Sequence, residues 1–169
     1  MRGQLVEDDQ IEKLNPYARF LQQEDPLTIL ATTPDRLEQL IVTATDEKLE
    51  QRPSPKKWSV RDILCHLADT ETAFAFRLRQ TIAEEHHLIQ PYDQDAFAAA
   101  YEDRTAKEGL DTFAAIRRWN LLFVRSAVPA ALPKAVTHPE RGTMTFKTIL
   151  ETMAGHDLNH LAQITALLS

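Results

Sequence analysis

The sequence predicts an all-α fold, a four-helix bundle formed by a single domain. Only four of the 169 residues are glycine, and the chain is rich in residues that favour helices. Four long segments repeat apolar residues with helical spacing, and the connectors between them differ in length. No segment shows the sustained alternation of apolar and polar residues that is typical of strands. Little β-structure is therefore expected.

The first long helix is expected over residues 27–45. Pro26 suits an early helical position, because its missing N–H has no partner there in any case. Thr33 and Pro34 form a second start signal, which makes this the point at which the segment would kink or break. The apolar stripe of this helix is formed by Leu30, Leu37, Leu40 and Ile41.

A second long helix is expected over residues 60–85, after a loop at 51–57 that contains two prolines. Ser59 and Asp62 resemble a capping box, with Asp in place of the usual Glu or Gln. The apolar residues that recur with helical spacing are Val60, Ile63, Leu64, Leu67, Phe74, Leu78 and Ile82.

The C-terminal half of the chain supplies the other two helices. Residues 86–108 are expected to be irregular or to hold short helices, and the third helix is expected over 110–128. Residues 133–144 are predicted to form a loop. The last helix is expected to begin near Thr145, a fair N-cap, and to run to the C-terminus.

Residues 1–25 are predicted to be an extension of the domain at 26–169. Residues 1–15 are polar and acidic, without the apolar region of a secretory signal. The second half of the extension carries residues that are expected to dock on the domain: Tyr17, Phe20 and Leu21.

The net charge of −6 disfavours two kinds of partner. A nucleic-acid-binding protein usually presents a basic stripe, and an anionic membrane surface also attracts basic segments. Here the basic residues form isolated pairs that are expected on the solvated surface: Lys56-Lys57 and Arg117-Arg118. Cys65 is the only cysteine and allows no intramolecular disulfide, which suits the cytoplasm.

The last helix carries two histidines on or beside its apolar face. At about 100° per residue, His160 falls inside the apolar stripe, His156 lies at its edge and Asp157 lies near its centre. Ionisable groups on a core-facing surface cost free energy unless they are paired or coordinated. Because His156 and His160 are four residues apart, both imidazoles can bind one metal ion. Histidines satisfied by hydrogen bonds, without a metal, are the alternative.

His66 offers a third ligand. It lies at the flank of the apolar stripe of the second helix, where a side chain can face a groove between helices. Three protein ligands leave a coordination position open for water or substrate, which is the pattern of a catalytic metal site. The remaining histidines are expected on the surface: His86, His87 and His138.

Two segments of the chain resemble the DinB-like superfamily. The first is WSVRDILCHL at residues 58–67, and the second is GHDLNHLAQI at residues 155–164. The second segment contains H-D-x-x-H-x-x-Q, a common form of the family's C-terminal signature. Both segments match in order and separation, and the similarity covers about residues 26–169.

The resemblance implies an up-down-down-up bundle with a divalent metal ion, often nickel or zinc, held by the residues that match His66, His156 and His160. It also implies frequent homodimers and a small-molecule substrate. The family includes S-transferases that use low-molecular-weight thiols such as bacillithiol, and a mycothiol-dependent isomerase. It does not imply DNA binding or polymerase activity.

We therefore expect a metal-dependent enzyme of the thiol-transfer or hydrolytic kind, in which a three-histidine site produces an anionic nucleophile near neutral pH. Asp157 and Gln163 are candidates for orienting imidazoles or substrate, and Asp157 could equally pair with an arginine. The rival hypothesis is a metal-stabilised binding or stress-response module without catalysis.

The remaining reactive and aromatic residues have simpler interpretations. Cys65 is adjacent to His66, but neighbouring helical residues point about 100° apart, which disfavours a Cys/His nucleophile pair. Cys65 is expected to be a buried or half-buried thiol. Trp58 and Trp119 are expected to pack in the core or at helix ends, or to line a pocket.

Overall fold

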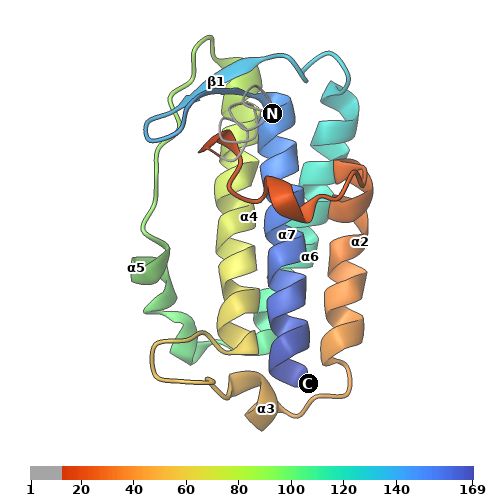
Figure 1. The fold of residues 1–169 in the computed structure, drawn as a ribbon, viewed down its shortest axis with the longest axis vertical. Coiled ribbons are helices and arrows are strands. Elements are labelled where there is room, and N and C mark those ends of the chain that lie inside the picture. The colour runs from red at the N-terminus through yellow and green to blue at the C-terminus, as the bar shows by residue number, and fades with distance from the viewer. Residues whose placement is uncertain (1–12) are drawn as a thin grey trace, which may run out of the picture.

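A computed structural model describes residues 13–169 as a bundle of four long helices (Figure 1). They are α2 (Pro26–Ile41), α4 (Val60–Ala83), α6 (Ala106–Ala127) and α7 (Phe146–Leu168). Helices α2 and α7 run in one direction and α4 and α6 in the other, which is the expected up-down-down-up order. Helix α7 lies against α2 and α4, and α6 lies against the same two helices. No helix within residues 13–169 is both long and apolar enough to cross a membrane.

The core consists of two apolar clusters with a buried polar layer between them. One cluster contains Phe146 at the start of α7, and the other contains Ile164 near its end. Between the clusters, each long helix contributes at least one buried polar residue. The residues of this polar layer include Thr33, Glu71, Arg117, Asn120 and Asp157. A layer of this kind in the middle of a bundle is where polar chemistry can be built.

Two of the long helices, α4 and α7, begin at the predicted N-caps. In the box before α4, the backbone N–H of Asp62 donates to Ser59 Oγ, and the backbone N–H of Ser59 donates to Asp62 Oδ2, both at 3.1 Å. Helix α7 begins directly after Thr145, which caps it as expected. Helix α6 begins at Ala106, four residues before the predicted start, because Thr105 and Glu108 form a further capping box.

The first long helix is shorter than predicted. Helix α2 ends at Ile41, and a separate short helix, α3 (Asp46–Glu50), follows with Thr45 as its N-cap. Pro34 lies inside α2, which continues through it without a break. The expected kink or break at Thr33 and Pro34 therefore does not interrupt the helix.

The predicted loop at 133–144 is wrong in part, because it contains a β-hairpin. Strands β1 (Ala135–His138) and β2 (Gly142–Thr145) pair antiparallel, with His138 opposite Gly142. Each strand has only four residues, so period-two alternation has too little length to stand out in the sequence. Gly142, at φ +94°, supplies the left-handed conformation that the turn requires.

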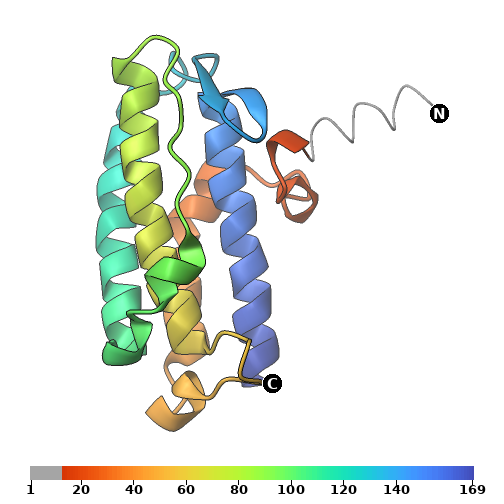
Figure 2. The ribbon, with the colours of Figure 1, turned by 90° about the vertical axis from the view of Figure 1, so that its left-hand side faces the viewer.

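Short helical elements complete the connectors. They are η1 (Ala18–Phe20), α5 (Gln94–Ala98) and η2 (Tyr101–Asp103). The last two lie within residues 86–108, as predicted. Figure 2 shows the connector between α4 and α5 passing in front of α4 and α7.

The segment before α2 docks on the bundle with the predicted residues. The Tyr17 ring meets the His156 ring edge-on with centroids 5.2 Å apart, and Leu21 packs against the apolar cluster that contains Phe146. Phe20 is half-buried, with its ring 6.4 Å from that of Tyr17. The acidic residues 1–12 of the predicted extension lie outside the described part of the chain.

Candidate metal centre

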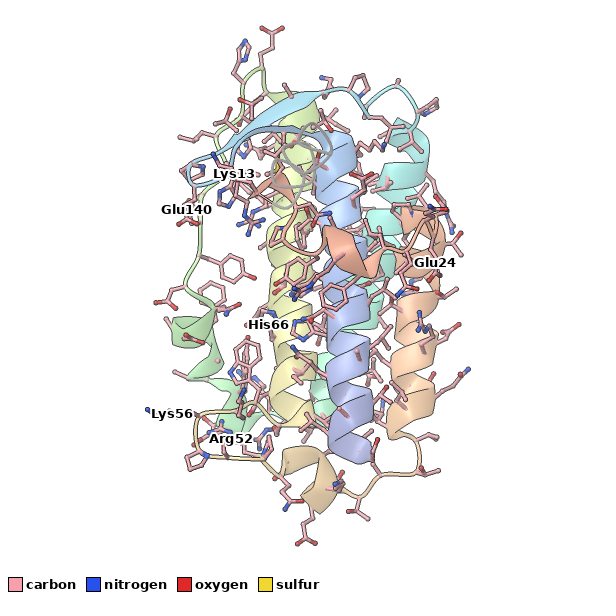
Figure 3. The ribbon with its side chains drawn as sticks, in the orientation of Figure 1. Lys13, Glu24, Arg52, Lys56, His66 and Glu140 are labelled. Atoms are coloured by element: carbon pink, nitrogen blue, oxygen red, sulfur yellow. The ribbon has the colours of Figure 1, made fainter. Side chains whose placement is uncertain are left out.

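The three histidines singled out in the sequence come together between α4 and α7. His66 Nε2 lies 3.0 Å from His156 Nε2, which lies 3.1 Å from His160 Nε2. One ring nitrogen from each residue lies within 4.8 Å of the other two. All three side chains are buried, and Figure 3 shows His66 pointing from α4 toward α7. We call these residues the triad.

The environment keeps the triad imidazoles neutral. Burial, followed by the proximity of His160, lowers the pKa of His66 to about 3. Burial likewise lowers the pKa of His160 to about 4. Burial and the two neighbouring histidines hold the pKa of His156 well below its usual value. Neutral imidazole is the form that binds a metal ion.

The hydrogen bonds of the triad leave nitrogen lone pairs facing one another. Gln163 Oε1 accepts a hydrogen bond from His160 Nδ1 at 2.9 Å, which leaves the lone pair of His160 on Nε2. His156 Nε2 is close to both partner nitrogens, but a single N–H can serve only one of them. At least two lone pairs therefore face a common point.

A cation at that point would satisfy all three nitrogens. Nitrogen ligands of tetrahedral zinc stand about 3.3 Å apart, since each Zn–N bond is about 2.0–2.1 Å. The Nε2 distances of 3.0 and 3.1 Å are close to this spacing. The donor set and its geometry thus fit a transition-metal ion. Gln163 is hydrogen-bonded to one imidazole of the triad, a contact that one of the roles considered for it in the sequence requires.

Asp157 is not hydrogen-bonded to any imidazole of the triad. Its carboxylate accepts from Arg117 Nη1 at 2.5 Å and from Arg117 Nη2 at 3.1 Å. Arg117 also binds Glu71, with Nη2 2.8 Å from Oε2. Of the two roles considered for Asp157, pairing with an arginine is the one observed.

Arg117 corrects a sequence prediction. It was expected on the surface with Arg118, but its side chain is only 2% exposed. Burial lowers the pKa of Arg117, and Asp157 and Glu71 more than offset this effect, so the net shift is upward. The charged guanidinium can be buried because two carboxylates surround it. Arg118 is exposed, as predicted.

A cavity of about 210 Å³ opens onto His66 and His156. We call it the triad cavity. Its wall also contains Tyr17, Thr70, Arg77, Tyr92, His138 and Arg141. The Thr70 hydroxyl lies 2.7 Å from the hydroxyl of Tyr92, and 3.4 Å from the His66 ring nitrogens.

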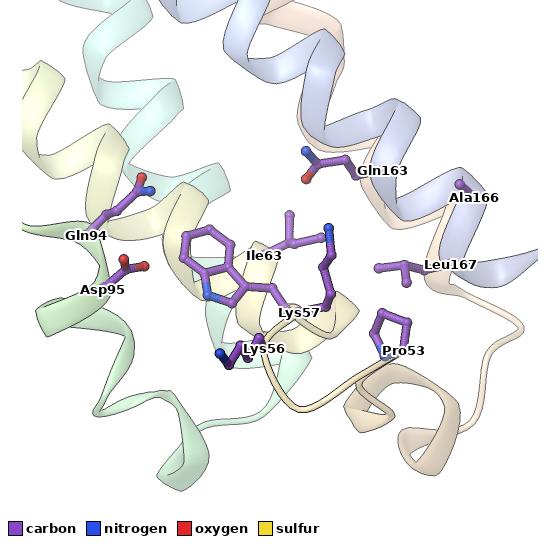
Figure 4. A pocket seen from close by; sticks show the side chains of 10 residues that line it. Pro53, Lys56, Lys57, Ile63, Gln94, Asp95, Gln163, Ala166 and Leu167 are labelled. Atoms are coloured by element: carbon purple, nitrogen blue, oxygen red, sulfur yellow. The ribbon is translucent and has the colours of Figure 1, made fainter.

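A second cavity, of about 470 Å³, contains no triad residue in its wall but is lined by Trp58 and Gln163, which contact His66 and His160. Trp58 lines it and places its ring 4.7 Å from that of His66, so the alternative considered for this tryptophan, that it lines a pocket, is observed. Figure 4 shows Gln163 of α7 and Gln94 of α5 on opposite sides of this Trp58 cavity. Because Gln94 also lines the triad cavity, the two cavities adjoin.

Two of the three histidines predicted on the surface are not exposed. His138 is buried, with 6% of its surface exposed, because the hairpin turns it toward the triad cavity. His87 has a side-chain exposure of 10% and places Nδ1 2.6 Å from Glu84 Oε2. His86 is exposed, as expected.

The other residues weighed in the sequence lie away from the triad. Cys65 is buried, as predicted, and lines a separate cavity of about 190 Å³ with Tyr101 and Gly109. Trp119 is 65% exposed, so the prediction that it packs in the core or at a helix end is wrong.

Sequence reasoning missed the arginines of the triad cavity. Arg77 lies eleven residues after His66, and Thr70 lies between them at helical spacing. This repeat places all three on one face of α4 and was a readable signal. Arg141 lies in a turn, where periodicity carries no information.

Comparisons with known proteins point to one family. A family model described as the DinB superfamily matches residues 29–164. "Putative metal-dependent hydrolase OB0782" of Oceanobacillus iheyensis is 31% identical over 136 residues, which cover 79% of this chain and 78% of that protein. "Putative metal-dependent hydrolase YfiT" of Bacillus subtilis is 26% identical over 151 residues, covering 86% of this chain and 84% of that protein.

A solved structure shares the fold. It is described by the statement "YfiT from Bacillus subtilis is a probable metal-dependent hydrolase with an unusual four-helix bundle topology". It superposes with a TM-score of 0.79 at 23% sequence identity, and the match covers 86% of this chain and 85% of that one. At this identity the likeness establishes the architecture.

Proposed function

The chain belongs to the DinB superfamily, and from that premise we propose that it is a metal-dependent hydrolytic enzyme whose metal ion is held by His66, His156 and His160. The observation that carries the proposal is the convergence of three buried, neutral imidazoles on one point, two of which line a cavity. The names of the relatives, which refer to metal-dependent hydrolases, favour hydrolysis.

The ligand set favours a transition-metal ion, and among these ions we propose nickel or zinc because the family resemblance implies them. Imidazole suits zinc, nickel, copper and iron, whereas magnesium and calcium prefer oxygen ligands. When bound, such an ion supplies Lewis acidity, which lets water or a low-molecular-weight thiol act as an anionic nucleophile near neutral pH.

The residues around the triad have separate tasks in this proposal. Gln163 holds the His160 imidazole in the tautomer that directs Nε2 inward. Trp58 and Tyr17 pack against His66 and His156 and limit the access of bulk water to these rings. A small-molecule substrate enters through the adjoining cavities.

Metal analysis tests the first half of the proposal. Protein purified without a His tag is reconstituted with nickel or zinc and measured by mass spectrometry. We expect one ion per chain in the wild type and loss of the ion in His160→Ala, because the remaining two imidazoles are a weaker site. His86→Ala, which changes an exposed histidine in the connector after α4, is the matched control. Wild-type protein that retains well below one equivalent of either metal refutes the metal site.

Turnover tests the second half. Metal-loaded wild type and His160→Ala are given a panel of esters and amides without thiol, and monochlorobimane with several low-molecular-weight thiols. Hydrolysis without thiol by the wild type, but not by His160→Ala, supports the proposal. Turnover only in the presence of thiol identifies an S-transferase instead. Tight metal binding with no turnover of either kind favours the non-catalytic binding or stress-response module.

Assembly and location are further proposals that rest on the family and the composition. We propose a homodimer, and the exposed apolar side chains of Phe76 on α4 and of Trp119 and Leu122 on α6 are candidates for its interface. Sedimentation of the wild type against Trp119→Lys tests this, and an unchanged mass excludes that surface. The cytoplasm is the proposed location, supported by the single cysteine.

A further inference from the structure

Two arginines face the triad cavity without a carboxylate partner in the part of the chain that the structure describes. Arg77 comes from α4, and Arg141 comes from the turn between β1 and β2. Within residues 13–169, the ion pairs shorter than 4.0 Å that involve an arginine are formed by Arg52, Arg61 and Arg117. In contrast to Arg117, the arginines of the triad cavity are thus not neutralised by the described part of the protein.

Among residues 13–169, the only carboxylate that lines this cavity belongs to Glu140. Glu140 is exposed, and Figure 3 shows it at the outer edge of the molecule. It lies beyond 4.0 Å from both arginines, since neither pair is among the ion pairs of the described residues. Glu140 therefore leaves the interior of the cavity positive.

The charged groups of this cavity shift one another's pKa values. Burial lowers the pKa of Arg77, Tyr92 opposes the effect, and Arg141 adds to it. Burial, Arg141 and Arg77 together lower the pKa of His138, against a smaller effect of Glu140. Two cations and a histidine therefore share a confined positive potential, which attracts anions.

The positive side chains are accompanied by neutral donors that are already in place. Arg77 Nη2 donates to the carbonyl oxygen of Gln90 at 3.2 Å, and its guanidinium lies 5.6 Å from the ring centroid of Tyr92. The hydroxyls of Tyr92 and Thr70 line the same cavity 2.7 Å apart, and the Thr70 hydroxyl lies 3.4 Å from the ring nitrogens of His66. A bound anion would meet a guanidinium that is held by its surroundings.

We propose that the triad cavity binds an anionic oxygen group, a carboxylate or a phosphate, of the substrate on which the triad acts, with Arg77 and Arg141 as its cationic contacts. This inference rests on the proposed function and names its substrate class. Guanidinium groups match carboxylate and phosphate geometry with paired N–H donors. The volume of about 210 Å³ suits the charged end of a small molecule and is too small for a polymer. The remainder of the substrate would extend past the triad toward the Trp58 cavity.

Equilibrium binding tests the inference without relying on turnover. Propionate and inorganic phosphate are titrated calorimetrically in low-chloride buffer, with propionamide and trimethyl phosphate as neutral counterparts. Both metal-loaded and metal-free protein are used, because a metal ion binds anions by itself. We expect at least one of the two anions to bind both forms, and the neutral counterparts to bind far more weakly.

Arginine variants identify the contacts. Arg77→Gln and Arg141→Gln are each expected to weaken anion binding by about 10- to 100-fold, as the loss of charge-assisted hydrogen bonds predicts. Arg118→Gln, which changes an exposed arginine of α6, should bind as the wild type does. Metal content and circular dichroism show that the fold and the triad of each variant are intact. If Arg77→Gln fails to fold, Arg141→Gln alone tests the anion site, because a substitution in a surface turn is not expected to prevent folding.

The outcomes separate this inference from the proposed function. Anion binding that is unchanged in both variants, or neutral compounds that bind as tightly as anions, overturns the inference. A chain that binds anions through the arginines but holds no metal refutes the proposed function and leaves the anion site standing. A chain that binds metal and hydrolyses esters but does not bind either anion refutes the anion site alone.

Discussion

The guanidinium of Arg117 pairs with the carboxylate of Asp157, the residue that follows His156, at an Nη1–Oδ2 distance of 2.5 Å. Arg117 also lies 2.8 Å from Glu71 of α4 and donates to the carbonyl oxygen of Leu30 in α2 at 3.0 Å. One side chain of α6 thus links the other three long helices. Because neighbouring helical residues point about 100° apart, the pairing of Asp157 fixes the rotation of α7 that turns His156 toward the triad.

Removal of Arg117 is therefore expected to be strongly destabilising. Arg117→Met leaves the carboxylates of Glu71 and Asp157 buried without a counter-ion, and we expect the free energy of unfolding to fall by about 3–5 kcal/mol. Urea unfolding followed by circular dichroism measures the change. Arg118→Met, at the adjacent exposed position, should cost no more than about 0.5 kcal/mol. An equal loss in the two variants would contradict the role of the ion pair.

Local sequence patterns predicted the features that depend on residues close together in one segment of the chain. The apolar stripes located the four long helices, and the Ser59–Asp62 box located the start of α4. The i, i+4 spacing of His156 and His160 indicated a shared site. Their meeting with His66, 90 residues earlier than His156, has no local signature. The family resemblance supplied that prediction, and metal ligation itself stays a prediction.

Features that depend on distant partners escaped local reasoning. Arg117 beside Arg118 has the pattern of a solvated basic pair, and its burial depends on carboxylates 40 and 46 residues away. His138 is buried because a hairpin with strands of four residues folds it inward. In both cases the tertiary neighbours outweigh the average exposure of the residue type.

Gln163 is expected to strengthen metal binding through His160. Gln163→Leu removes the acceptor of the 2.9 Å hydrogen bond from His160 Nδ1, so the imidazole loses its fixed tautomer. We expect the affinity for zinc or nickel to fall about 10-fold, measured by competition with a chromogenic chelator. Gln163→Glu keeps an acceptor and should retain most of the affinity. A leucine variant that binds metal as tightly as the wild type would exclude this role.

Cys65 is expected to be unreactive in the folded protein. Burial, followed by the charge of Asp62, raises the pKa of its thiol from 9.0 to about 11. The reactive thiolate is therefore scarcer in the folded chain than in the unfolded chain at every pH below about 11. At pH 8 we expect iodoacetamide to label Cys65 at least about 50-fold more slowly without urea than with it. The labelling rate of the folded chain should still rise between pH 9 and 10.

The same reasoning predicts that Cys65 has no chemical role in the metal site. Cys65→Ala should retain the metal content of the wild type and any turnover that the wild type shows. Rapid labelling of the folded chain, or a loss of turnover with full metal content, would revive the Cys/His nucleophile pair that the sequence analysis disfavoured.

Gly155 is expected to be required for the docking of the segment before α2. A Cβ at this position would lie 2.5 Å from the carbonyl oxygen of Tyr17 and 2.7 Å from its Cβ, so the backbone of that segment would have to move. Alanine favours the helical state over glycine by about 1 kcal/mol, so a loss of docking in Gly155→Ala could not come from a weaker α7.

Because Tyr17 packs against His156 and lines the triad cavity, its displacement should also weaken anion binding there. Trypsin cleavage after Arg19 should be several-fold faster in Gly155→Ala than in the wild type or in Thr165→Ala, an exposed substitution on the same helix. Unchanged cleavage together with unchanged anion binding would show that the segment accommodates the methyl group in place.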